Sequence, residues 1–221
     1  LKKKGRDCLQ RQSLFNSKMI YTITLNPALD KTFIVDHLEI NEIGRVQNTA
    51  IEAGGKGFNV SRALHRAGIA SQALGFVGGN TGRNLLEGLQ RDGLDVIPIP
   101  ISGETRVNQV FMETPSKSVK INASGPEISK TENQQLINKV KELAVPEDIW
   151  IMSGSLPPKV PSTVYAEITR IIHGCGGKVF LDSSGNAFQE GLNVPPDWIK
   201  PNLKEAREIF SGGLQEVDLL E

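Results

Sequence analysis

The segment AGGKGFNVSR, residues 53–62, places a lysine and an asparagine among three glycines, directly before a helical pattern. Backbone N–H groups are unpaired at a helix N-terminus, so glycines there let a polar or anionic ligand approach them. A flexible turn that only feeds the helix would explain the same glycines, and the segment alone leaves both interpretations open. Lys56 favours the ligand site, because its glycine neighbours give it little to pack against.

Two common nucleotide-binding motifs are excluded at this segment. A P-loop needs Gly-Lys followed by Ser or Thr, and Lys56 is followed by Gly57. A dinucleotide-binding Gly-x-Gly-x-x-Gly pattern that begins at Gly55 would need a third glycine where Val60 stands. Any ligand site here must therefore be of another kind.

Further polar side chains follow the predicted strands, where ligands of open α/β sheets bind. They are Asp30 after the first strand, Ser153, Ser155, Asp182, Asn202 and Glu205. Structural roles remain open for some of them. Asp30 would also cap a turn after Pro27, and Asn202 with Glu205 would also serve as a helix N-cap and a first-turn acid.

These residues sit in an alternation of strands and helices. Strands are predicted at 20–24, 73–78, 148–154, 178–182 and 198–202, and helices at 81–93, 161–171 and from 203 onward. Ser129 and Glu132 form a capping box ahead of another helix. Val60, Ala63, Leu64 and Ala67 fall on one helical face, which predicts a helix after the glycines that ends at Gly68. The alternation predicts an α/β fold with a doubly wound, mostly parallel sheet.

Two segments interrupt this alternation, at residues 32–50 and 105–122. Both have the pattern of β-ribbons, the second turning at 114–117, and neither has room for a crossover helix. We expect them to form a small β-sheet apart from the main one. Such a sheet would act either as a lid over the site or as an edge used in dimerisation.

Composition narrows the class of protein. The 221 residues are 38% hydrophobic and 23% charged, which is typical of soluble globular proteins. The 25 basic residues balance 25 acidic ones, so no basic footprint for nucleic acid is present. No apolar stretch approaches the ~20 residues of a membrane helix. Cys8 and Cys175 have no metal-ligand spacing, which predicts reduced thiols in a cytosolic protein.

The first residues, LKKKGRDCLQRQSLFNSK, are charged but are followed by no apolar signal region. We predict that residues 1–18 are a leader outside the fold and that residues 19–221 form the domain.

Five segments in this order carry a family resemblance: TLNPALD (24–30), AGGKGFNVSRAL (53–64), TRVN (105–108), SGSLPP (153–158) and KPNLKE (200–205). From Met19 to the end the chain resembles the PfkB group of ribokinase-like carbohydrate kinases, and within it the 1-phosphofructokinase and tagatose-6-phosphate kinase subgroup. The resemblance implies a ribokinase-like fold and a cytoplasmic enzyme that uses ATP and Mg²⁺. Its substrate would be a ketohexose phosphate, foremost fructose 1-phosphate, converted to fructose 1,6-bisphosphate.

The resemblance also assigns roles to individual residues. The sugar end of the acceptor would be held by Asp30, Gly54, Gly55, Lys56 and Asn59. The acceptor's existing phosphate would be reached from the small sheet by Arg106, Arg45 and Lys120, although charges on strands are commonly just solvated. The metal positions would be Asp182, Asn202 and Glu205, and the nucleotide positions Lys200 and Lys204.

One family motif does not occur in this sequence. The family's Gly-Ala-Gly-Asp turn carries the catalytic base and an anion hole, and here only AREIFSGGLQEVDLLE follows Glu205. No catalytic residue is therefore assigned, and we expect a C-terminally truncated kinase domain that is inactive alone. The alternatives are a tagatose-6-phosphate kinase, or a non-catalytic protein that binds sugar phosphates or forms a dimer.

Overall fold

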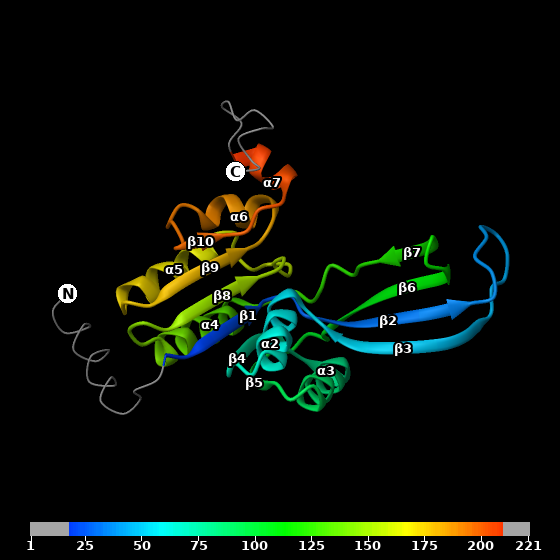
Figure 1. Cartoon of the computed structure of the whole chain (residues 1–221), viewed down its shortest axis with the longest axis horizontal. Helices are drawn as coiled ribbons and strands as arrows, with labels where there is room; N and C mark the ends of the chain where they lie inside the picture. Colours follow the sequence, from blue (N-terminus) through cyan, green and yellow to red (C-terminus); the bar gives the residue numbers. More distant parts are fainter. Residues whose placement is uncertain (1–17, 210–221) are drawn as a thin grey trace.

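The computed structural model describes residues 18–209 (Figure 1). The predicted leader, apart from Lys18, and residues 210–221 of the predicted domain lie outside the described residues. Within the described part, no helix is both long and apolar enough to cross a membrane.

The described residues contain a six-stranded sheet in which every pair of neighbours is parallel. Its strands are β1 (Ile20–Thr24), β4 (Gln72–Val77), β5 (Asp95–Pro100), β8 (Ile149–Ser153), β9 (Lys178–Asp182) and β10 (Trp198–Ile199). Their order across the sheet is β10-β9-β8-β1-β4-β5, so the chain winds outward in both directions from the centre. The predicted parallel sheet is confirmed.

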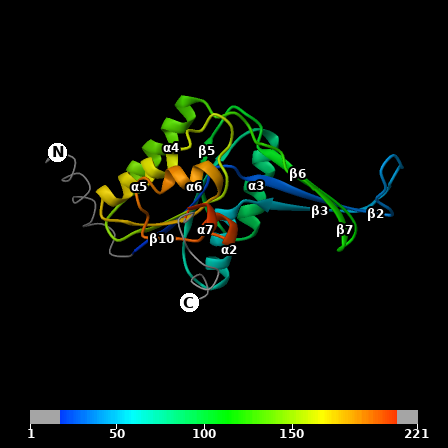
Figure 2. The same ribbon diagram turned by 90° about the horizontal axis from the view of Figure 1, so that it is seen from above.

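Helices cover both faces of this sheet. On one face lie α4 (Lys130–Leu143), α5 (Val164–Gly174) and α6 (Gly185–Gly191), as seen from above in Figure 2. On the other face lie α2 (Lys56–Arg66) and α3 (Gly79–Arg91). The final described helix is α7 (Leu203–Ile209). Two separate apolar clusters result, one around Trp150 and Tyr165 and one around Phe58 and Leu89.

A second sheet projects from the body as an arm (Figure 1). It is four-stranded in the described residues, with order β3-β2-β6-β7, and is mixed because only β2 and β6 run parallel. Its strands are β2 (Ala28–Val35), β3 (Val46–Gly54), β6 (Arg106–Thr114) and β7 (Lys117–Ile121). The predicted small sheet is confirmed, but β2 begins before residue 32 and β3 ends after residue 50. Asp30 consequently lies inside β2 and does not follow β1 in a turn.

The helix predicted after the glycines is confirmed as α2, but its apolar face is not the face that it buries. Ala63 and Ala67 are exposed, and Val60 and Leu64 are only half-buried, whereas Gly57, Phe58 and Ser61 are buried. The first turn of the helix sets this contact. Gly57 lies so close to β1 that an added Cβ would be 2.7 Å from the carbonyl oxygen of Ile23.

Polar contacts complete the docking of α2 on β1. The backbone N–H of Phe58 donates to Thr24 Oγ1 at 3.0 Å, and the hydroxyls of Thr22 and Ser61 are 2.8 Å apart. Hydrophobic periodicity cannot detect a face that is held by threonine and serine.

Strand β5 and helix α6 were not predicted from the sequence. Strand β5 contains Pro98 and Pro100, which normally argue against a strand, yet it occupies the edge of the sheet, where a missing N–H can face solvent. Helix α6 is short and contains glycine at both ends, so its pattern is weak.

Candidate functional site

The glycine segment forms the turn between β3 and α2. Gly55 is the N-cap residue with φ of 140°, a conformation that L-residues rarely adopt. Since Gly55 has no side chain to cap the helix, Thr24 of β1 supplies the acceptor for the N–H of Phe58. The turn therefore requires glycine for structural reasons, and it brings Asn59 close to the end of β3.

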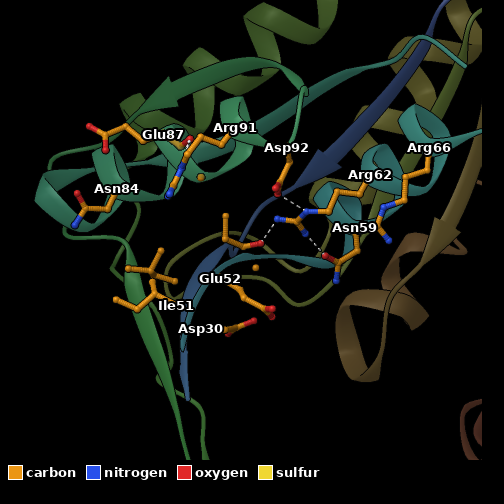
Figure 3. Close-up of a pocket in the computed structure, with 14 residues that line it drawn as sticks. Asp30, Ile51, Glu52, Asn59, Arg62, Arg66, Asn84, Glu87, Arg91 and Asp92 are labelled. Atoms are coloured by element: carbon orange, nitrogen blue, oxygen red, sulfur yellow. Dashed lines mark hydrogen bonds and ion pairs between the residues drawn. The ribbon is translucent and has the colours of Figure 1, made fainter. Parts of the chain in front are cut away.

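A cavity of about 710 Å³ opens beside this turn (Figure 3). It is lined by residues of β2, β3, α2 and α3 and by Asp92 after α3. Asp30 of β2, Gly54 of β3 and Asn59 of α2 all border it. The cavity thus brings together three of the residues that the family resemblance assigns to the sugar.

Asp30 is held at the base of the small sheet by Asn108, the neighbouring residue on β6. Asn108 Nδ2 donates to Asp30 Oδ1 at 2.8 Å, and Asn108 is almost fully buried. The other oxygen lies against Gly54, where an added Cβ would be 2.3 Å from Asp30 Oδ2. Gly54 therefore makes room for the carboxylate, and one carboxylate oxygen stays without a hydrogen bond to the described residues.

Arg106 lies on the same face of the small sheet as Asp30, because Ala28 pairs with Arg106 and Asp30 with Asn108. Its Nη1 donates to the carbonyl of Ala123 at 2.7 Å and its Nη2 to the carbonyl of Asn26 at 2.8 Å. Burial lowers the pKa of the Arg106 guanidinium, and the negative charge of Asp30 opposes that shift. Arg106 does not line the cavity, but it is close enough to Asp30 to feel its charge.

Asn26 joins the arm to the body at the same place. Besides accepting from Arg106, it donates through Nδ2 to the carbonyl of Ser124 at 2.9 Å. Weaker contacts of 3.4 Å reach Ser155 Oγ and the carbonyl of Leu156 in the loop after β8. Through its backbone carbonyl and its side chain, Asn26 thus links the start of β6, the chain after β7 and the loop after β8.

Lys56 points away from the cavity. Its Nζ lies 3.2 Å from Asp182 Oδ1, at the carboxyl end of β9, and Lys200 Nζ lies 3.6 Å from the other oxygen. Asp182 is mostly buried, with 15% of its side chain exposed, whereas both lysine side chains are more than half exposed. The result is a cluster with one excess positive charge, separate from Asp30 and Asn59.

Asn202 and Glu205 form a capping box at the start of α7. Glu205 N donates to Asn202 Oδ1 at 2.9 Å, and Asn202 N donates to Glu205 Oε2 at 2.8 Å. In the described part of the chain, no three His, Cys, Asp or Glu residues are grouped to hold a metal ion. The side chain of Lys204 lies outside the described residues.

Arg45 and Lys120 lie further out on the arm. Arg45 accepts a hydrogen bond from the N–H of Asp36, and Asp36 lies about 20 Å along the strand from Asp30. Arg45 is thus too distant to share a ligand with Asp30 of the same chain. Lys120 pairs with Val110 on the Asp30 face of the sheet and is exposed there.

Two residues of the site were missed by sequence reasoning, Asn108 and Arg62. Asn108 ends the motif TRVN, and its contact with Asp30 depends on the register between β2 and β6. Arg62 follows Asn59 by one helical turn, and this spacing was a signal that could have found it. Its Nη1 donates to Asn59 Oδ1 at 2.5 Å.

Comparison with known proteins identifies the family. The family model described as pfkB family carbohydrate kinase matches residues 22–220. The 1-phosphofructokinase of Bacillus subtilis is 34% identical over 200 residues, which cover 90% of this chain and 65% of the relative. The tagatose-6-phosphate kinase of Staphylococcus epidermidis is 35% identical over 195 residues, which cover 87% of this chain and 63% of the relative.

Among solved structures, phosphofructokinase-2 from Escherichia coli in complex with fructose-6-phosphate matches with a TM-score of 0.85 at 29% identity. The match covers 91% of this chain and 67% of that one. The chain belongs to the pfkB family of carbohydrate kinases. It spans less than two thirds of the length of the two curated relatives.

Proposed function

We propose that this chain is the acceptor-binding part of an ATP-dependent sugar-phosphate kinase of the cytoplasm, and that its acceptor is a ketohexose phosphate, foremost fructose 1-phosphate. The observation that carries the proposal is the meeting of Asp30, Gly54 and Asn59 at one cavity, with Arg106 beside Asp30. The names of the relatives support the substrate class, since each acts on or binds a phosphorylated ketohexose.

In this proposal each side chain meets a different part of the acceptor. The free oxygen of Asp30 accepts a hydrogen bond from a sugar hydroxyl, and Asn59 donates to a sugar oxygen. Arg106 holds the existing phosphate, because a guanidinium presents several N–H donors to phosphate oxygens. Lys120 adds a cation from the same face of the arm. Within one chain Arg45 has no part in this contact.

The nucleotide side is proposed at Lys56, Lys200 and Lys204. The two cations beside Asp182 suit the phosphates of ATP, which supplies the phosphoryl group when bound. A directly bound Mg²⁺ does not fit the residues as they stand. Both oxygens of Asp182 face lysines, and Asn202 and Glu205 bond to each other's backbone. We therefore propose Mg²⁺ only as an ion that accompanies ATP.

The carboxylates that border this cavity are Asp30, which is proposed to bind the sugar, and Glu52, Glu87 and Asp92. We propose none of them as the base that deprotonates the acceptor hydroxyl, because the family resemblance assigns that base to a Gly-Ala-Gly-Asp turn that does not occur in this sequence. General-base catalysis contributes about 10²–10⁴ in rate, and preorganised donors for the developing charge contribute a similar factor. We accordingly propose that the 221-residue chain binds its acceptor but phosphorylates essentially none of it.

A second proposal concerns the arm, which we infer forms a homodimer. On the face opposite Asp30, Phe33 and Phe111 stack with centroids 5.1 Å apart, and Val119 and Ile121 are about half exposed. A single-layer sheet gains little stability from apolar side chains that stay in water, so this face favours a covering partner. A non-catalytic, dimer-forming protein is the alternative that this surface would also suit.

The test is a coupled ADP-release assay on two proteins, the 221-residue chain and a version extended through a Gly-Ala-Gly-Asp segment. Fructose 1-phosphate, tagatose 6-phosphate, fructose 6-phosphate and unphosphorylated fructose serve as acceptors. We expect the extended protein to use fructose 1-phosphate best and the short chain to be at least about 10⁴-fold slower. Similar rates for both proteins would show that the base lies within the short chain. A preference for another acceptor would refute the assignment to fructose 1-phosphate.

A further inference from the structure

We propose that Arg62 is a positioning residue that fixes the orientation of the Asn59 amide, so that the NH₂ group and not the carbonyl of Asn59 is presented to the ligand. The inference rests on the proposed function, since it specifies how Asn59 would meet the sugar phosphate. It makes the site select an oxygen that accepts a hydrogen bond at this position.

The chemistry of the contact determines the orientation of the amide. Arg62 Nη1 lies 2.5 Å from Asn59 Oδ1, and a guanidinium has donors only, so the atom it meets must be the amide oxygen. Asn59 Nδ2 makes no hydrogen bond to any residue in the described part of the chain. Asn59 is exposed and borders the cavity, which leaves both of its N–H groups available to a ligand (Figure 3).

Arg62 is itself held in place by two other elements. Its Nη2 donates to the carbonyl of Ala53, the residue before the Gly54-Gly55 turn. Its Nε donates to Asp92 Oδ2 at 2.6 Å, just after α3. Only 17% of the Arg62 side chain is exposed. One planar side chain thus ties the end of β3, Asn59 and the end of α3 together, which a lysine with a single ammonium could not do.

The pairing with Asp92 also argues against a direct role for Arg62 in binding phosphate. The carboxylate neutralises the guanidinium, and the three bonds already direct its donors at Ala53, Asn59 and Asp92. Arg106 differs, because its hydrogen-bond partners are backbone carbonyls and no carboxylate in the described part of the chain forms an ion pair with it. We therefore expect Arg62 to act on the ligand through Asn59 alone.

The experiment is a double-mutant cycle on the full 221-residue chain with fructose 1-phosphate as the ligand. The variants are Arg62→Gln, Arg62→Lys, Asn59→Ala and the pair Arg62→Gln with Asn59→Ala. Arg170→Gln is the control, because it removes the same charge from the exposed surface of α5. We expect each Arg62 variant and Asn59→Ala to weaken binding about tenfold, the value of one hydrogen bond. The pair should bind no more weakly than Asn59→Ala alone.

A second readout observes the Asn59 side-chain amide by ¹⁵N NMR in the absence of ligand. Arg62→Gln should shift that signal, and Arg170→Gln should leave it in place. Losses that add in the double variant, or an Asn59 signal unaffected by Arg62→Gln, would overturn the inference. If the wild-type chain binds none of the ketohexose phosphates, the proposed function fails, and the NMR signal still decides whether Arg62 orients Asn59.

Discussion

In both Asp30 and Asn59, the Oδ1 atom already accepts a hydrogen bond from a neighbouring side chain. Asn108 donates to Asp30 Oδ1, and Arg62 donates to Asn59 Oδ1. What is left for a ligand is an acceptor on Asp30 and a donor on Asn59. Such a pair suits a sugar hydroxyl that donates a hydrogen bond to Asp30 and a neighbouring sugar oxygen that accepts one from Asn59. The neighbours Asn108 and Arg62 are therefore as much part of the site as the two residues that would touch the sugar.

The substitution Asn108→Asp tests whether the hydrogen bond from Asn108 holds Asp30 in place. The substitution places a second carboxylate 2.8 Å from Asp30 Oδ1 in a buried position, and like charges raise each other's pKa. We expect a lower melting temperature than the wild type at pH 7. The difference should shrink toward pH 5, because one shared proton then restores a hydrogen bond. Differential scanning fluorimetry between pH 5 and pH 7 measures this difference in melting temperature.

The control for this prediction is Asn48→Asp on β3. Asn48 is exposed on the arm, and its Oδ1 accepts a hydrogen bond from Thr49 N that a carboxylate can also accept. This variant should melt close to the wild type at both pH values. A pH-independent loss in Asn108→Asp would mean that packing, and not charge, holds Asp30.

The sequence predicted the meeting of Asp30, Gly54 and Asn59, because their types and spacing carry the family's pattern. It could not predict where Lys56 points, since a flexible side chain among glycines can face either the sugar or Asp182. Nor could the sequence predict that Arg45 lies too far from Asp30 to share a ligand with it in the same chain. Its place on the ribbon depends on where the turn between β2 and β3 falls, and sequence patterns locate turns poorly.

Among the elements, α2 is the one that positions the site, and it does so through close backbone contact. An alanine Cβ at Gly57 would lie 2.6 Å from Thr24 Oγ1 and 2.7 Å from the carbonyl oxygen of Ile23. Gly57→Ala should therefore push α2 from β1 and lower stability by about 1–3 kcal/mol. Urea unfolding measures the loss. Gly174→Ala is the control and should not destabilise, because no described heavy atom outside its own stretch of α5 lies within 4 Å of the added carbon.

Helix α4 is tied to the body by Glu132. Burial raises the pKa of this carboxyl, but hydrogen bonds from Ser102 and Ser129 outweigh it and lower the pKa to about 2. The carboxylate is charged in the folded state, so its contribution to stability is complete above its ordinary pKa of 4.5. That contribution should be lost as the pH falls from about 4.5 to about 2.

Glu132→Gln tests this linkage. We expect the variant to be less stable than the wild type by about 2 kcal/mol at pH 7, because hydrogen bonds to a charged group are replaced by neutral ones. The gap should narrow as the pH approaches 2, as measured by urea unfolding. Glu87→Gln on the exposed face of α3 should show no such gap. A gap that stays constant with pH would contradict the low pKa of Glu132.

Elements were predictable where apolar pattern and capping agreed. The box of Ser129 and Glu132 in front of α4 is an example, since local sequence determines it. The buried face of α2 was not predictable, because its contacts are a glycine approach and paired hydroxyls. Strand β5 was obscured by its prolines, and only its edge position makes them acceptable.

Over the whole molecule, the main sheet and the arm meet at Asn26 and Arg106, and the outer part of the arm is covered on neither face by another described element (Figure 1). We expect a dimer through the face that carries Phe33, Phe111, Val119 and Ile121. Ile121→Lys should convert it to a monomer in sedimentation velocity at micromolar concentration. Ile69→Lys, at a comparably exposed isoleucine after α2, should leave the dimer intact. A wild-type chain that sediments as a monomer would refute this interface.

The arrangement of the two sheets was predictable from the interruption of the strand–helix alternation. The faces of the arm were not, because they depend on the register between four strands.

We propose that this chain forms a ketohexose phosphate site at Asp30. Isothermal titration calorimetry of fructose 1-phosphate tests it most directly, with Asp30→Asn and the control Asp95→Asn at the opposite end of the parallel sheet. We predict one binding event for the wild type and for Asp95→Asn, and at least tenfold weaker binding for Asp30→Asn, because the free acceptor oxygen loses its charge. Equal binding by all three proteins, or no binding by the wild type, would refute a ketohexose phosphate site at Asp30.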